Sequence, residues 1–112
     1  IDGGGAGIAD GIRGDLEIPF ACTIERVTML ADQTGSIVVD IWKDTFANFP
    51  PTVGDSITAA AKPTIAAANK SQDLTLVGWT TAIAAGDVLR FNVESGVSNI
   101  QRLTLSLRVF TP

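Results

Sequence analysis

The chain of 112 residues contains no histidine and no tyrosine, and it has a single cysteine. Without histidine it lacks the commonest general base and a frequent metal ligand, so Ser-His-Asp and Cys-His catalytic arrangements are impossible within one chain. The lone Cys22 cannot form an intramolecular disulfide, and its apolar neighbours indicate a thiol that packs as a small hydrophobe. These absences make an enzyme the minority interpretation.

Charged side chains are also scarce: they make up 18% of the residues, and the net charge is -4. Lys and Arg are dispersed and form no basic stripe of the kind that neutralises a phosphate backbone, so nucleic acid is not an expected partner. No apolar run approaches the ~20 residues of a membrane span, and we expect no membrane insertion. No phosphate loop or calcium loop is present in the sequence, so no cofactor and no metal are expected.

Hydrophobic residues, in contrast, make up 46% of the chain, which indicates one packed globular core. The start of the chain differs, because glycine recurs there outside any periodic pattern. We predict a glycine-rich lead or linker over residues 1–14 and a single β-sandwich domain over residues 15–112. Because the chain begins with Ile1 and not with methionine, we expect a trimmed product or a piece of a longer polypeptide.

From Asp15 onward, apolar and polar residues alternate in several runs, which is the pattern of half-buried strands. Pro19 lacks a backbone donor and favours an edge position for the first strand. The turn residues DQTG predict a hairpin between TIERVTMLAD and SIVVDIWK, and further strands are expected in LTLVGWTTAI, DVLRFNVES and IQRLTLSLRVF. The side chains expected to point inward are Leu16, Ile18, Phe20, Ile37, Val39, Ile41, Leu89, Phe91, Val93, Leu103, Leu105, Leu107 and Val109.

Between Asp44 and Asp73 the alternation fades into a long connection that is rich in alanine. Pro63 would interrupt any helix across it, so at most a short helical turn is expected. Six or seven strands without a convincing amphipathic helix predict an all-β fold, an antiparallel β-sandwich of the jelly-roll type.

Two arrangements of catalytic groups remain formally open without histidine. A glycosidase needs only two carboxyl groups about 5 to 10 Å apart, and the closest pairs in the sequence are Asp15 with Glu17 and Asp40 with Asp44. A solvated strand face and a turn explain these acids more simply, because Asp and Glu are mostly exposed. A catalytic serine–lysine pair could use Lys43, Lys62 or Lys70, but the spacing of the sequence marks none of the three for this role.

An aromatic and polar surface is the strongest candidate for a binding site. Flat rings flanked by Asp and Asn suit a sugar ring or a neighbouring protein chain. The competing interpretation is that the phenylalanines fold back to close one end of the sandwich and that Trp79 is partly core, which the high average burial of aromatic residues favours. The candidate residues for ligand or partner binding are Asp40, Trp42, Asp44, Phe46, Asn48, Phe49 and Trp79.

Several segments resemble a domain that recurs in bacteriophage and prophage virion proteins, especially tail and fibre-like structural proteins. The resemblance extends from Gly14 to Val109, although no single segment is a mechanistic motif. The segments are GDLEIPFACTI, GSIVVDIWKDTFANFPPT, SITAAAKPT, GWTTAIAAGDVLRFNV and LTLSLRV.

The resemblance implies a non-catalytic, virion-associated β domain that is made in the bacterial cytoplasm and acts in assembly or in adhesion to the host surface. The implied partners are other virion chains, including further copies in a homotrimer, and a cell-surface glycan. A carbohydrate-binding module of a larger protein is the alternative, with Trp42 and Trp79 as its sugar-stacking residues. No catalytic residue is carried over.

Overall fold

Six antiparallel strands and one short 3-10 helix form the fold of the computed structural model, which describes residues 1–112. The elements are β1 (Gly11–Ile18), β2 (Cys22–Asp44), η1 (Val53–Asp55), β3 (Thr64–Asp73), β4 (Ala82–Ile83), β5 (Asp87–Val93) and β6 (Leu103–Phe110). The strands join one open sheet in the order β1-β5-β2-β3, with β4 and β6 also paired to β2. The all-β antiparallel class is therefore confirmed, whereas the jelly-roll sandwich stays a prediction. No helix is long and apolar enough to cross a bilayer.

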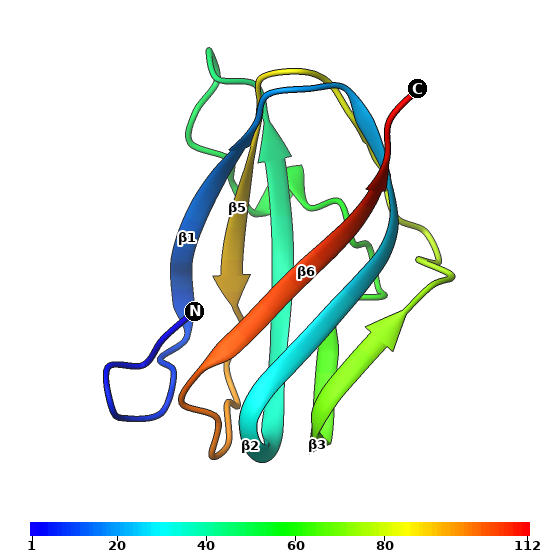
Figure 1. Ribbon diagram of the computed structural model, residues 1–112. Coiled ribbons are helices and arrows are strands. Elements are labelled where there is room, and N and C mark those ends of the chain that lie inside the picture. The colour runs from blue at the N-terminus through cyan, green and yellow to red at the C-terminus, as the bar shows by residue number, and fades with distance from the viewer.

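β2 and β3 form one long ribbon that folds over at its middle (Figure 1). The first arm of β2, residues 22–31, and its second arm, residues 35–44, both pair with β3, and the register shifts between them. β6 pairs with the first arm and β5 with the second, so β6 and the first arm lie in front of β5 and the second arm in Figure 1. The bent ribbon thus connects two layers of the sheet, and we call this side the closed flank.

The ribbon bends at Gly35, and a glycine is needed there because the segment around Ser98 passes very close to its backbone. A β-carbon there would overlap the carbonyl oxygen of Ser98 and lie 2.9 Å from Cγ1 of Ile100. Ser36 and Ser98 exchange backbone hydrogen bonds of 3.0 and 2.9 Å at the same place. The predicted hairpin is wrong in one respect: the chain reverses here, but no strand pairing joins the two arms of β2. Their edges are taken by β3, β5 and β6 instead.

The core consists of two hydrophobic clusters, each of which combines residues from both arms of β2. The expected inward orientation of Ile37, Val39 and Ile41 is confirmed, because all three are buried. The first cluster contains Cys22, Ile24, Val27, Ile41, Ile57, Leu76, Trp79, Ile83 and Leu89. The second contains Ile8, Met29, Ile37, Val39, Ile65, Val93, Ile100 and Leu103. Burial of the unpaired Cys22 raises the pKa of its thiol.

β1 is an edge strand, and its apolar face is poorly covered. Leu16 is 51% exposed and Phe20 also remains exposed, although the alternating pattern predicts both as inward-facing. Leu16 lies opposite the buried Leu89 in the register, so the pattern assigned its face correctly. The side chain stays exposed because β1 pairs only with β5.

Two segments differ from the expected elements. β3 replaces part of the expected long connection, because its pairing with both arms of β2 overrides the helix propensity of its alanines. Residues 74–81 form turns where a strand was expected, and only β4 remains from that run. The carboxylate of Asp73 accepts the N–H groups of Thr75 (3.0 Å) and Leu76 (3.2 Å), and these bonds lower its pKa. The expected short helical turn is present as η1.

The glycine-rich start of the chain is attached to the rest of the fold. Ile8 is buried in the second cluster, and its N–H donates to the carbonyl of Ile100 (3.0 Å). Asp2 forms an antiparallel bridge with Arg102. β1 begins at Gly11, so the expected boundary at residue 14 falls inside a strand.

Candidate functional site

Asp40 is the centre of a buried polar network on the outer face of the second arm. Its side chain is on the face opposite the core, as the alternation predicts, yet the residue is only 2% exposed. Oδ1 accepts hydrogen bonds from the N–H of Ile41 (2.8 Å) and the hydroxyls of Ser56 (2.7 Å) and Thr58 (2.6 Å). Oδ2 accepts the indole N–H of Trp42 (3.0 Å). The carboxylate therefore fixes the Trp42 ring, and it also fixes the segment with Ser56 and Thr58, which covers this face.

Lys62 supplies the positive charge nearest to this network. Its Nζ lies 4.0 Å from Oδ2 of Asp40 and 2.5 Å from Oε1 of Glu94. The hydrogen bond to Glu94 raises the pKa of Lys62. Asn92 donates to the other oxygen of Glu94 (3.2 Å), so the polar network continues onto β5. Lys62 therefore offsets part of the negative charge that Asp40 and Glu94 carry.

The loop after β2 carries the candidate residues that are most exposed. Oδ1 of Asp44 accepts the N–H of Thr45 (2.8 Å) and the side-chain amide of Asn48 (3.3 Å), which fastens the loop at its base. Phe46 is 74% exposed and Phe49 is 46% exposed. The phenylalanines do not fold back into the core, and both rings remain accessible to a partner.

Phe49 is held in place by a charged partner on the sheet. The guanidinium of Arg90 lies over its ring, 5.0 Å from the centroid. Arg90 also donates two hydrogen bonds to Asp15 (2.7 and 3.1 Å), and these raise the pKa of the guanidinium. The loop, β5 and β1 are thereby connected by one chain of contacts.

The two tryptophans lie in different environments. Trp42 is half-buried on the outer face, with its N–H donated to Asp40. Trp79 is only 9% exposed, belongs to the first core cluster and donates its N–H to the carbonyl of Ala61 (2.9 Å). The structure therefore gathers Asp40, Trp42, Asp44, Phe46, Asn48 and Phe49 at one end of the second arm, and it places Trp79 in the core. The binding role of these residues stays a prediction.

Apart from Glu17 and Lys70, which are exposed, the acids and lysines considered for catalysis have partners within the fold. Asp15 binds Arg90, and both oxygens of Asp40 accept protein hydrogen bonds. Lys43 donates to the carbonyl of Ala82 (2.6 Å). No three Cys, Asp or Glu side chains come together as a group that could hold a metal ion.

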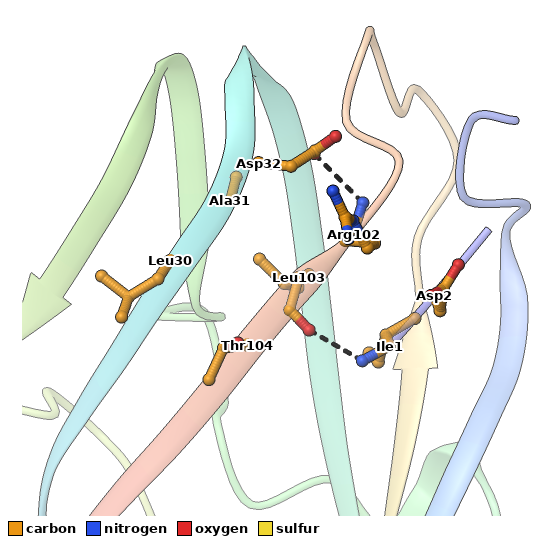
Figure 2. A pocket seen from close by; sticks show the side chains of 8 residues that line it. All are labelled: Ile1, Asp2, Leu30, Ala31, Asp32, Arg102, Leu103 and Thr104. Carbon is orange, nitrogen blue, oxygen red and sulfur yellow. Dashed lines mark hydrogen bonds between the residues drawn. The ribbon is translucent and has the colours of Figure 1, made fainter. Parts of the chain in front are cut away.

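A further cavity, of about 450 Å³, lies where the N-terminus meets the start of β6 and the end of the first arm of β2 (Figure 2). Asp32 anchors its rim by accepting the N–H groups of Gln101 (3.0 Å) and Arg102 (3.1 Å). The Arg102 bond lowers the pKa of Asp32. Sequence reasoning missed this cavity because its residues are distant along the chain and carry no motif. They are Ile1, Asp2, Leu30, Ala31, Asp32, Arg102, Leu103 and Thr104.

Comparison of the chain with protein-family models, curated protein sequences and solved structures finds no match.

Proposed function

We propose that the chain is a non-catalytic virion domain of the phage tail or fibre type, and that it contacts the host surface through the loop that carries Phe46 and Phe49. The observation that carries this proposal is the exposure of both rings on a loop fastened at its base by Asp44. The resemblance of five sequence segments to phage virion domains supports the context. A cell-surface glycan or a neighbouring virion chain is the expected partner.

The proposed adhesion depends on an aromatic surface that is partly ordered before a partner binds. Exposed phenylalanine rings gain free energy when a partner removes them from water. The hydrogen bonds of Asp44 and the contact of Phe49 with Arg90 restrict the loop before binding, so less conformational entropy is lost on docking. The Asp40 network holds the end of β2 from which the loop emerges.

The test is adhesion of the fluorescently labelled domain to a panel of bacterial cells. Binding to at least one strain is expected, and Phe46→Ala should reduce it at least about tenfold. Val53→Ala is the matched control, because Val53 is also highly exposed and apolar but lies outside the aromatic loop. Robust turnover of a polysaccharide or peptide that disappears with Asp40→Asn would contradict the proposal.

Virion association needs a separate test. An antibody against the purified domain should label the tails of particles released when prophages are induced in the source strain. Staining confined to the cell interior, with unlabelled particles, would count against the virion role.

A carbohydrate-binding module is the second candidate, and the exposed Phe46 ring beside the polar Asn48 favours it. A glycan array with wild type, Phe46→Ala and Trp42→Ala separates it from the first candidate. Ring-dependent binding of free glycans would favour the module, whereas no signal on any printed glycan would count strongly against it. Since Trp79 is buried, it is not expected to stack on a sugar.

A further inference from the structure

β6 is paired along only one edge for most of its length. That edge pairs with the first arm of β2. On the other edge, only the start of β6 has a partner: Ile1 and Leu103 exchange backbone hydrogen bonds of 2.7 and 2.8 Å, and Figure 2 shows Ile1 beside the strand. Residues 105–110 have no strand on this edge. β1 pairs only with β5, so it also has a free edge.

An apolar groove of about 200 Å³ lies between β1 and β6. All nine side chains that line it are hydrophobic, and those of Leu16 and Phe20 are exposed. They are Leu16, Ile18, Phe20, Cys22, Ile83, Phe91, Leu105, Leu107 and Val109. We call this side of the molecule, with its two free strand edges, the open flank. Unpaired edges beside exposed apolar side chains favour the addition of another strand.

The outer faces of the two free strands carry opposite charges. Glu17 on β1 is exposed and belongs to no ion pair. On β6, the side chain of Arg108 is 63% exposed, and its one ion pair, with Glu25, is long at 3.8 Å. Arg108 lies opposite Arg26 in the register, and this juxtaposition of like charges is unfavourable. An additional carboxylate beside Arg108 would therefore be stabilising.

We propose that two copies of this chain associate through their open flanks, with β1 of each copy beside β6 of the other. β1 and β6 run in the same general direction in Figure 1. A two-fold axis along that direction therefore brings β1 of the second copy beside β6 of the first and, by symmetry, β6 of the second beside β1 of the first. Both free edges gain a neighbour in one step, and the two apolar grooves face each other.

The backbone directions agree with this parallel arrangement. Leu103 bonds to Ile1 on the free edge, so by alternation Leu107 also directs its N–H and C=O toward that edge. Ile18 accepts the N–H of Gly86 on the β5 side (2.7 Å), so Leu16 directs its backbone away from the free edge of β1. In a parallel pair, a residue whose backbone faces the neighbour lies beside one whose backbone faces away. Leu107 can therefore lie beside Leu16 with both side chains on the groove side.

This register also matches the charges. With Leu107 of one copy beside Leu16 of the other, the next residue along each strand brings Arg108 beside Glu17 on the outer face. β1 of a second copy therefore supplies both the apolar residue and the acidic residue that match Leu107 and Arg108. Two β6 strands would match less well, because β6 contains Arg108 and no acidic residue.

The experiment is sedimentation velocity over a range of concentrations, with the charge pair reversed one residue at a time. Wild type is expected to form a dimer. Arg108→Glu and Glu17→Arg should each raise the dimer dissociation constant at least about tenfold, because each brings like charges together. The double variant should return to within about threefold of wild type. Lys70→Glu, the same change of charge at an exposed position on β3, is the matched control and should leave the constant unchanged.

A second variant tests the groove. Leu107→Glu should abolish the dimer, whereas Ser106→Glu, one residue away on the outer face, should weaken it much less. Circular dichroism of each variant checks that the fold is retained, and Leu16→Glu on the exposed side of the groove replaces Leu107→Glu if that variant unfolds.

A monomer at all concentrations would overturn the proposal. A trimer, which the phage resemblance implies, would overturn the two-fold arrangement. A dimer that tolerates both single charge reversals would show that the copies meet elsewhere. None of these outcomes bears on adhesion through Phe46, which lies outside the groove.

Discussion

The closed and open flanks of the sheet differ in how their strand edges and apolar side chains are covered. On the closed flank, the bent ribbon of β2 and β3 connects both layers, and the polar network of Asp40 covers the outer face beside it. On the open flank, β1 and β6 each have a free edge, and apolar side chains such as Leu16 remain exposed. Chain continuity therefore closes one side of this fold, whereas the other side keeps two strand edges that no other strand of the chain covers.

The largest expected effect comes from removing the buried carboxylate of the closed flank. Asp40→Ala leaves the Trp42 indole and two hydroxyls without their acceptor, and Lys62 keeps only Glu94 as an anionic partner. We expect a loss of about 4 kcal/mol in the free energy of unfolding, measured by urea denaturation. Asp44→Ala is the control and should cost about 1 kcal/mol or less, since the hydrogen bonds of Asp44 are exposed. Equal losses for both variants would contradict the central role of Asp40.

The bend of the ribbon is the next most sensitive point. Gly35→Ala forces a methyl group against the Ser98 carbonyl and should destabilise the fold by about 3 kcal/mol. Thermal unfolding would show this as a clear fall in Tm. Gly14→Ala is the matched control: nothing lies within 4 Å of a β-carbon there, so Tm should change little. A Gly35→Ala variant as stable as wild type would show that the connection at Ser98 is free to move.

On the open flank, the same kind of truncation should cost much less. Leu16→Ala should lower the free energy of unfolding by about 1 kcal/mol in dilute solution, because the side chain is already 51% exposed. Truncation of a buried leucine such as Leu89 typically costs about 2 to 5 kcal/mol. Chemical denaturation of the two variants compares the flanks directly. Similar losses would mean that Leu16 is covered in solution even at low concentration.

The smallest expected effect is a pH dependence from Asp73 at the end of β3. Its pKa is lowered in the folded chain, chiefly by the N–H of Leu76, so the carboxylate stabilises the fold fully above about pH 4. This contribution is lost as the pH falls through the folded pKa. Asp73→Asn should therefore reduce the difference in stability between pH 7 and pH 3, whereas Asp10→Asn, at an exposed position, should retain it. Identical pH profiles for wild type and Asp73→Asn would contradict this role.

Sequence alternation was sufficient to assign the faces of the best-packed strands. Ile37, Val39 and Ile41 point into the core as predicted. Side chains alternate between the two faces of a strand, so burying the apolar face determines the orientation of every residue. The same pattern gave the correct face for Leu16 but not its exposure. The exposed fraction of a side chain depends on which strands lie nearby, and the strand order cannot be read from the alternating pattern.

Sequence reasoning failed where distant contacts determine the local structure. β3 is alanine-rich and has no alternating pattern, so its pairing with β2 could not be foreseen. Among the candidate site residues, the position of Trp42 beside Asp40 on one face followed from the alternation. The burial of Asp40 did not, because it results from Ser56 and Thr58, which lie 16 and 18 residues further along the chain.

The single buried cysteine gives the open flank a built-in chemical reporter. Cys22 lines the apolar groove, and burial raises the pKa of its thiol, so both the shielding and the low thiolate fraction slow its alkylation. The rate at which a thiol reagent modifies the native chain therefore measures how often this side of the molecule opens. The same rate, followed as protein concentration rises, would show directly whether a neighbour shields the groove.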